Sequence, residues 1–415
     1  SVYTMSLHEQ RDGILKTQIT WADLEKHLQK ALKTSATLGP SKNVVDIGEE
    51  NGFASRCGLV LCDWTGAEKD EKLPETVVLK IPSALPMKKM GVMQGDAAMW
   101  EGYDKKLREL HNIEIAAYNF LGEFEGLPIP RMYYGEAFTE EDKLNGQICI
   151  EFVENSRVMN FYVEHTVEQL KQIARALGKI HACSLKKEIT APELKTNMLA
   201  DFAKTVSLEA FRGMFKALLS LDSSEETKNL LERIEEILPE YYGSTLSSTI
   251  HKQMGLRPVL VNGDLRTENV LINNDTGDLA SLIDWQCAYS GVGVTDLLRI
   301  SLFALSAKER RESASLLVEE MHTSMVANLG GGEPPYSLVT LQSLNAILLP
   351  HSATYFAAGG IVIIAKQEAN AKLSMEEKEK RKPVQMDKVI GALEDILVYH
   401  RKNRELVKEL KFKDQ

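Results

Sequence analysis

Size, composition and charge set the first limits on this chain. Its 415 residues are 44% hydrophobic and 26% charged, which is typical of a folded protein with a large core and two or three globular units. The net charge of −10 argues against nucleic-acid and anionic-membrane partners, because both need a concentrated excess of Lys and Arg. We therefore expect any anionic ligand to be held at a local site.

The five cysteines and the apolar segments indicate a cytoplasmic protein. The cysteines are scattered and follow neither a C-x-x-C pattern nor a Cys/His metal-binding spacing, so we interpret them as reduced and mostly buried. No N-terminal signal for secretion is indicated. The long apolar stretch 346–365 contains Pro350, His351 and a Gly-Gly pair. We expect it to be a buried core helix, not a membrane span.

The first part of the chain changes from helical to strand periodicity. Residues 1–42 are predicted to form an N-terminal extension with a capped helix at 20–33. Residues 43–155 are predicted to form a small antiparallel sheet with one inserted helix at about 104–122. The expected strands lie at 43–48, 55–64, 76–82 and 146–153.

The rest of the chain, residues 156–415, is predicted to be a larger and mainly helical lobe. Helical spacing runs through 167–185 and 222–242, and it resumes beyond Asp296. Together with the preceding sheet, this predicts an α+β fold with two lobes.

An exception to the helical pattern is the segment 270–284, where two apolar strands flank turn residues. An antiparallel hairpin there would bring Asn269, just before the first strand, beside Asp284, at the end of the second. Asp264 lies on the loop that leads into the hairpin. Mg²⁺ prefers a few such oxygen ligands, and phosphoryl transfer needs this metal and an acid that orients the attacking hydroxyl. Each acid alone fits a polar surface turn better, so the prediction depends on the three together.

The segment 48–55 between two predicted strands could fold over a polyphosphate. Gly48 and Gly52 would relieve backbone crowding, and the backbone amides of Phe53, Ala54 and Ser55 would be donors. A plain hairpin turn explains the same residues equally well.

Lys80 ends an apolar run, where a lysine is costly unless it pairs with an anion. Glu114 lies among apolar residues of the predicted helix and could face inward to pair with Lys80. A lysine that reaches solvent and an exposed glutamate are the alternatives.

These motifs resemble the protein-kinase-like fold when they are taken in chain order: G-x-x-x-G-F-A-S, V-V-L-K, the helix glutamate, I-E-F-V-E-N, G-D-L-R-T-E-N-V-L and I-D-W-Q. The chain most resembles the ecdysteroid kinase-like family, also called CHK kinase-like, within the choline and aminoglycoside kinase group. The motifs span about residues 40–300. The pattern G-D-L-x-x-x-N followed by I-D-W is specific, whereas the glycine loop is not.

The resemblance implies that ATP and Mg²⁺ are cofactors. Asp264, in a catalytic loop over 262–269, would be the catalytic base, and Asn269 and Asp284 would hold Mg²⁺. Lys80, positioned by Glu114, would contact the phosphates. The implied adenine hinge is Glu151, Phe152 and Val153, and the implied apolar walls are Val60, Val78 and Ile283.

One residue departs from the family pattern, because Asn262 stands where a His usually precedes Gly-Asp. Asn can also donate and accept hydrogen bonds, so we predict an active enzyme, with a nucleotide-binding pseudokinase that acts as a scaffold or sensor as the alternative. The short segment between Asp284 and Asp296 leaves no platform for a peptide substrate. We therefore expect a small hydroxyl acceptor, lipophilic or steroid-like or a glycoside, in a pocket walled by the helical insertion 186–250.

Overall fold

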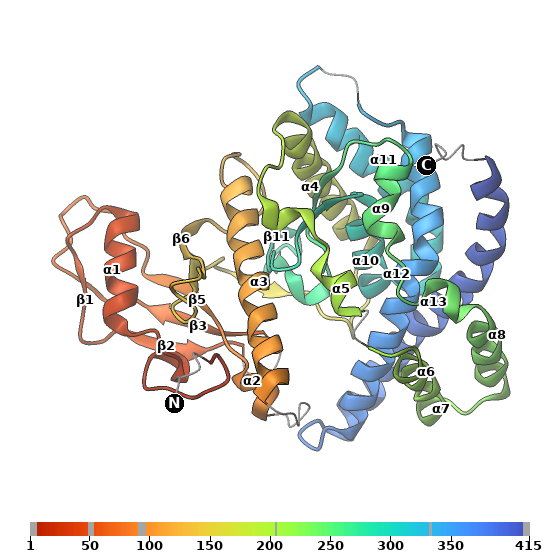
Figure 1. Ribbon diagram of the computed structural model, residues 1–415, viewed down its shortest axis with the longest axis horizontal. Coiled ribbons are helices and arrows are strands. Elements are labelled where there is room, and N and C mark those ends of the chain that lie inside the picture. The colour runs from red at the N-terminus through yellow and green to blue at the C-terminus, as the bar shows by residue number, and fades with distance from the viewer. Residues whose placement is uncertain (1–5, 49–53, 90–96, 204–205, 332–333, 410–415) are drawn as a thin grey trace. The chain divides into compact units, whose positions relative to one another are not determined.

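The chain divides into two compact units in the computed structural model (Figure 1). The structure describes residues 6–48, 54–89, 97–203, 206–331 and 334–409. The first unit comprises Ser1–Glu125 and Ile129–Glu154, and the second comprises Gly126–Pro128 and Asn155–Gln415. The three-part domain division at residues 42 and 155 stays a prediction.

The first unit is built on an antiparallel sheet of five strands in the order β2, β3, β5, β7, β6. These strands are β2 (Asn43–Asp46), β3 (Ser55–Leu61), β5 (Thr76–Pro82), β7 (Gln147–Glu151) and β6 (Met132–Glu136), and a separate short pair is formed by β1 (Thr37–Leu38) and β4 (Trp64–Thr65). The predicted strands are present. β6 was not predicted, because all of its residues are half-buried and show no alternation.

The helices of the first unit are η1 (Ile14–Lys16), α1 (Trp21–Leu32), α2 (Leu85–Lys89) and α3 (Ala97–Leu121). α1 begins at a capping box, in which Thr20 and Asp23 accept each other's backbone N–H. Its Leu24 and Leu28 are fully buried in the core cluster that includes Val77 of β5. α3 begins seven residues before the predicted start at 104. Its first turns are mostly exposed and carry no hydrophobic periodicity, so the sequence pattern did not reveal them.

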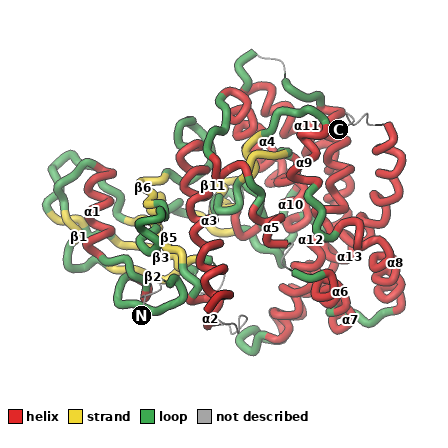
Figure 2. Tube along the Cα trace, viewed as in Figure 1, coloured by secondary structure: helices red, strands yellow, loops and turns green. Residues whose placement is uncertain are grey.

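The second unit is mainly helical (Figure 2) and contains two small antiparallel sheets. Its strands are β8 (Ser156–Val158), β9 (Val259–Val261), β10 (Val270–Asn273), β11 (Leu279–Leu282) and β12 (Tyr289–Gly291). Its helices are α4 (Val167–Lys186), η2 (Pro192–Lys195), α5 (Met198–Ala203), α6 (Leu208–Lys216), α7 (Leu218–Leu221), α8 (Glu225–Tyr241), α9 (Leu246–Gln253), η3 (Thr267–Asn269), α10 (Val294–Ala304), α11 (Ala307–Asn328), α12 (Leu338–Ala369) and α13 (Met375–Glu409). The predicted α+β class is confirmed.

Buried helices form the core of the second unit. α12 is, within the described ranges, the one helix long and apolar enough to cross a membrane by length and composition, and 67% of its apolar window is buried. It packs against α10 and α13, as expected of a core helix. The buried ammonium of Lys388 on α13 donates to the carbonyl oxygens of Phe161, Val163 and Phe303 at 2.7–2.9 Å, and so attaches α13 to the end of α10.

Candidate active site

The loop after β9 carries Asp264 in a fixed backbone conformation. Gly263 has a φ of +83°, and a Cβ there would lie 2.2 Å from the carbonyl oxygen of Cys287, so the position requires glycine. The N–H of Asp264 donates to Asn262 Oδ1 at 3.2 Å, and its carbonyl accepts from Asn269 Nδ2 at 2.8 Å. Side chains on both sides of Asp264 therefore fix its position.

The hairpin of β10 and β11 brings Asn269 close to Asp284, as predicted. Val270 pairs with Leu282, and the N–H of Ile283 donates to the carbonyl of Asn269 at 3.0 Å. Asp284 follows with a φ of +59°, an uncommon conformation for a residue other than glycine. Gln286 Nε2 donates to its carboxylate at 3.3 Å.

Asn262 links the catalytic loop to the segment after the hairpin. Its Nδ2 donates to the carbonyl of Asp284 at 3.1 Å, while its Oδ1 accepts from Asp264. Asn262 is fully buried. Asn262, which departs from the family pattern, thus uses its donor and its acceptor to join the loop of Asp264 to the segment of Asp284.

Asp296 on α10 also holds this loop, although its role was not predicted from the sequence. Its carboxylate accepts the N–H of Asn262 at 2.7 Å and of Gly263 at 3.0 Å, and the residue is 1% exposed. Burial raises the pKa of Asp296 to about 7, against the opposing effect of these two donors. The available signal was an acid in the mostly apolar segment V-T-D-L-L-R-I-S-L-F-A.

Arg299, one turn further along α10, was also missed. Its guanidinium contacts the Asp264 carboxylate, and the Nε of Arg266 lies 3.7 Å from the other carboxylate oxygen. Arg299 also lies over the ring of Phe303, 5.5 Å from its centroid. Asp264 therefore faces two cations.

In the first unit, Lys80 and Glu114 form the predicted ion pair. Lys80 Nζ lies 2.7 Å from Glu114 Oε2, and the side chains are only 13% and 3% exposed. The two alternatives, a lysine in solvent and an exposed glutamate, are therefore wrong. Burial lowers the pKa of the nearby His111 to about 4, with Lys80 adding to the effect, so this imidazole is neutral.

Strand register determines which residues share a face with Lys80. Lys80 pairs with Cys57 and Val78 pairs with Leu59, and cross-strand partners point to the same face of a sheet. Val60 pairs with Val77 instead, and it is fully buried in the core cluster with α1. Val60 therefore lies on the opposite face of the sheet from Lys80, which contradicts the expectation that both residues face the nucleotide.

The remaining predicted nucleotide-binding residues are placed only in part. Gly48 donates its N–H to Asp46 Oδ1 at 3.0 Å, and the carbonyl of Ala54 accepts from the N–H of Ser83 at 3.1 Å. Ser55 begins β3, whereas Gly52 and Phe53 lie outside the described residues.

The predicted hinge begins at the end of β7. The backbone N–H of Glu151 donates to the carbonyl of Arg131 at 2.8 Å, and its carboxylate accepts the Arg131 N–H at 3.1 Å. Phe152 and Val153 follow outside the strand. Ile283, the other predicted wall, belongs to the second unit and directly precedes Asp284.

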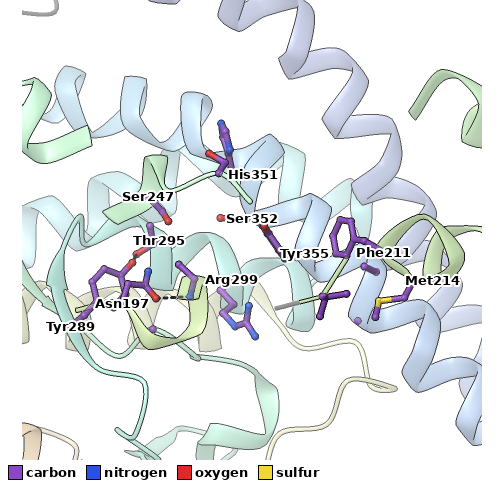
Figure 3. A pocket seen from close by; sticks show the side chains of 16 residues that line it. Asn197, Phe211, Met214, Ser247, Tyr289, Thr295, Arg299, His351, Ser352 and Tyr355 are labelled. Atoms are coloured by element: carbon purple, nitrogen blue, oxygen red, sulfur yellow. Dashed lines mark hydrogen bonds between the residues drawn. The ribbon is translucent and has the colours of Figure 1, made fainter. Parts of the chain in front are cut away.

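A cavity of about 370 Å³ in the second unit adjoins the loop that carries Asp264, because Gly263 lines it. Figure 3 shows the lining side chains, with Arg299 and Tyr355 among those labelled. Gly263 and Arg299, the neighbours of Asp264 in sequence and in space, form part of its wall. The other lining residues are Asn197, Ala200, Val206, Phe211, Met214, Ser244, Ser247, Tyr289, Thr295, His351, Ser352, Tyr355, Ala358 and Gly359. None of these described lining residues is acidic. Burial lowers the pKa of His351 to about 4, so Arg299 is the charged group in this lining.

With this geometry, the chain can be compared with known proteins. It belongs to the family DUF1679, described as "Uncharacterized oxidoreductase dhs-27", which matches residues 7–404. A relative, the "Uncharacterized kinase-like protein D1044.1" of Caenorhabditis elegans, is 24% identical over 374 residues, which cover 89% of this chain and 95% of that protein.

The "Uncharacterized oxidoreductase dhs-27" of Caenorhabditis elegans is 20% identical over 315 residues, which cover 71% of this chain and 36% of that protein. This chain thus matches about a third of the length of that relative.

Two solved structures align over most of this chain with TM-scores below 0.5. The choline kinase from Cryptosporidium parvum Iowa II has 12% sequence identity and a TM-score of 0.48, with 93% of this chain and 97% of that chain covered. A putative aminoglycoside phosphotransferase from Ralstonia eutropha JMP134 has 12% identity and a TM-score of 0.43, with 91% and 97% covered.

Proposed function

We propose that this protein is an ATP-dependent kinase that transfers the γ-phosphoryl group to a hydroxyl of a small molecule. The observation that carries the proposal is the position of Asp264. Its N–H and carbonyl are hydrogen-bonded to Asn262 and Asn269, and Gly263 and Arg299, which precede and contact it, line a cavity of about 370 Å³. A cavity of this size suits a small molecule, and an acid next to it suits proton transfer.

Asp264 would accept the proton of the acceptor hydroxyl. The hydroxyl oxygen would form a bond to the γ-phosphorus as the bond to the bridging oxygen breaks and ADP leaves. Arg299 would orient the Asp264 carboxylate through the contact described above. Asn262 and Asp296 would keep the loop in place by their hydrogen bonds.

The residues present suit Mg²⁺ and ATP. Asn269 and Asp284 offer the amide and carboxylate oxygens that Mg²⁺ prefers, and the metal would neutralise phosphate charge. Lys80, held by Glu114, would contact the phosphates, with the backbone amides of Ala54 and Ser55 as further donors. The residues Glu151, Phe152 and Val153 would receive the adenine, with Leu59 and Val78 as apolar neighbours in the same unit.

The lining of the cavity favours a lipophilic acceptor without a positive charge. Phe211, Met214 and Tyr355 supply apolar surface, and no acidic side chain among the described lining residues would balance a cationic acceptor. A steroid-like alcohol or another lipophilic hydroxyl fits this lining, and a glycoside is the alternative.

All five cysteines are free thiols, which agrees with the cytoplasmic location that we propose.

A second candidate function is a nucleotide-binding pseudokinase that acts as a scaffold or sensor. The contact of Arg299 with Asp264 favours it, because the guanidinium occupies the carboxylate that the acceptor hydroxyl would otherwise approach. An oxidoreductase is less well supported. Dinucleotide-binding folds use a parallel sheet, whereas every strand pair in the described part of the chain is antiparallel.

The test is to incubate the full chain with MgATP and a metabolite extract and to search by mass spectrometry for products that gain a phosphoryl group. The Asp264→Asn variant should lose product formation by several orders of magnitude while MgATP affinity stays within a few-fold. Asp284→Asn should instead weaken Mg²⁺-dependent nucleotide binding. A wild-type protein that binds MgATP but phosphorylates nothing would support the pseudokinase.

A further inference from the structure

A second cavity, of about 430 Å³, lies in the same unit and carries cationic side chains. Lys195 ends η2, Lys252 lies in the last turn of α9, and Arg257 precedes β9. The other lining residues are Ser184, Glu188, Ile189, Asn197, Ser248, His251, Pro258, Tyr289 and Ser290. Three cations and one carboxylate therefore face this space, in a chain whose net charge is −10.

These three cations are available to a ligand. Within the described ranges, no ion pair involves Lys195, Lys252 or Arg257, and each residue is exposed, so ligand binding would not require an existing pair to break. His251 beside them is 6% exposed, and its Nδ1 has no hydrogen-bond partner. An unmatched imidazole nitrogen next to three cationic side chains is a site that an anion with acceptor oxygens can complete.

The cationic cavity adjoins the cavity beside Asp264. Asn197 and Tyr289 line both spaces. Tyr289 is 3% exposed, and its hydroxyl lies 3.5 Å from that of Thr295, which also lines the first cavity (Figure 3). One ligand that passes these two side chains would therefore have an apolar environment at one end and a cationic one at the other.

We propose that the acceptor is an amphipathic molecule with an anionic group, which is a carboxylate, sulfate or phosphate, in addition to its hydroxyl. The hydroxyl would lie at Asp264, the apolar body in the first cavity, and the anion against Lys195, Lys252 and Arg257. This inference rests on the proposed kinase function. It adds a specificity site, because charge-assisted hydrogen bonds at the second cavity distinguish an acid from its neutral analogue.

The test compares ω-hydroxydodecanoate with its methyl ester by isothermal titration calorimetry on the full chain without nucleotide. The flexible chain allows both ends to find their positions. We expect the acid to bind about 10-fold or more tightly than the ester, and the difference to shrink at high salt. The double variant Lys252→Ala/Arg257→Ala should bind both compounds with the affinity of the ester. Lys228→Ala, which removes an exposed lysine of α8 paired with Glu225, is the matched control and should behave as the wild type.

Equal affinity of acid and ester, no binding of the acid, or a preference that survives in the double variant would each overturn the inference. Phosphorylation of the two compounds with MgATP then separates it from the proposed function. Selective binding of the acid without any product supports the anion site and counts against the kinase. Equal turnover of acid and ester supports the kinase and counts against the anion site.

Discussion

The guanidinium of Arg299 contacts the carboxylate of Asp264, and both positions depend on one helix. Asp296, three residues before Arg299 on α10, accepts the N–H of Asn262 and Gly263 from the loop that carries Asp264. α10 therefore holds the backbone of the loop through Asp296, and it holds the carboxylate of Asp264 through Arg299. A displacement of α10 would move the proposed catalytic group directly.

Replacing Arg299 tests whether this contact orients Asp264. Arg299→Met keeps much of the apolar stem but removes the charge and the donor, so we expect turnover to fall by about 10- to 100-fold with MgATP affinity unchanged. Steady-state kinetics and calorimetry measure the two quantities. Arg175→Met is the control, because Arg175 also pairs with a carboxylate, that of Glu320, but lies outside the lining of both cavities. Faster turnover in Arg299→Met would instead identify the contact as inhibitory.

The buried pair of Lys80 and Glu114 leads to a prediction for nucleotide binding. Lys80→Met removes the proposed phosphate contact, so MgATP affinity should fall by about 10-fold or more. Glu114→Gln keeps the shape but leaves Lys80 without its anion in a largely buried place, which should weaken binding by a smaller factor and lower the melting temperature. Calorimetry and thermal unfolding provide both values. If both variants bind MgATP as the wild type does, the pair is structural only.

Local sequence patterns predicted the parts of the site that lie on contiguous segments. The hairpin that joins Asn269 to Asp284 has both strands and its turn within 15 residues, so alternation and turn chemistry were sufficient. The pairing of Lys80 with Glu114 followed from two charges in apolar surroundings. Asp296 and Arg299 were missed because helical spacing shows which face is apolar but not which loop that face will meet.

Tertiary packing determined what the sequence could not. Alternation assigns β3 two faces without saying which one meets α1, so Val60 was expected on the face that Leu59 occupies. The cavities are walled by segments far apart in the chain, such as α6 and α12, which no local pattern brings together. Gly263 is part of the G-D-L motif, but only the close approach of the Cys287 carbonyl oxygen shows why this position requires glycine.

Gly263 provides a test of the loop geometry. Gly263→Ala combines a positive φ with a Cβ 2.2 Å from the Cys287 oxygen, so the loop must move. Gly243 in the same unit has a φ of +68° with nothing within 4 Å of an added Cβ, and Gly243→Ala should cost only about 1 kcal/mol. We expect Gly263→Ala to be clearly less stable than this control in chemical denaturation, and to lose turnover. Similar losses of stability in the two variants would show that the loop accommodates a Cβ.

The raised pKa of Asp296 predicts a pH dependence of stability. Burial raises this pKa from 3.8 to about 7, so between these values the folded protein keeps a proton that the unfolded chain has released. The free energy of unfolding therefore falls as the pH rises from about 4 to 7, by on the order of a few kcal/mol from this group. Asp296→Asn cannot titrate, and one amide oxygen remains to accept an N–H.

The measurement is urea unfolding of wild type and Asp296→Asn at several pH values between 4.5 and 7.5. The comparison uses the pH slope of the difference and not its absolute value, so a constant loss from the substitution does not affect it. The wild type should lose stability relative to the variant as the pH rises. Parallel curves would mean that the N–H groups of Asn262 and Gly263, with Arg299, keep Asp296 ionised throughout, and that the loop is held by a carboxylate at every pH tested.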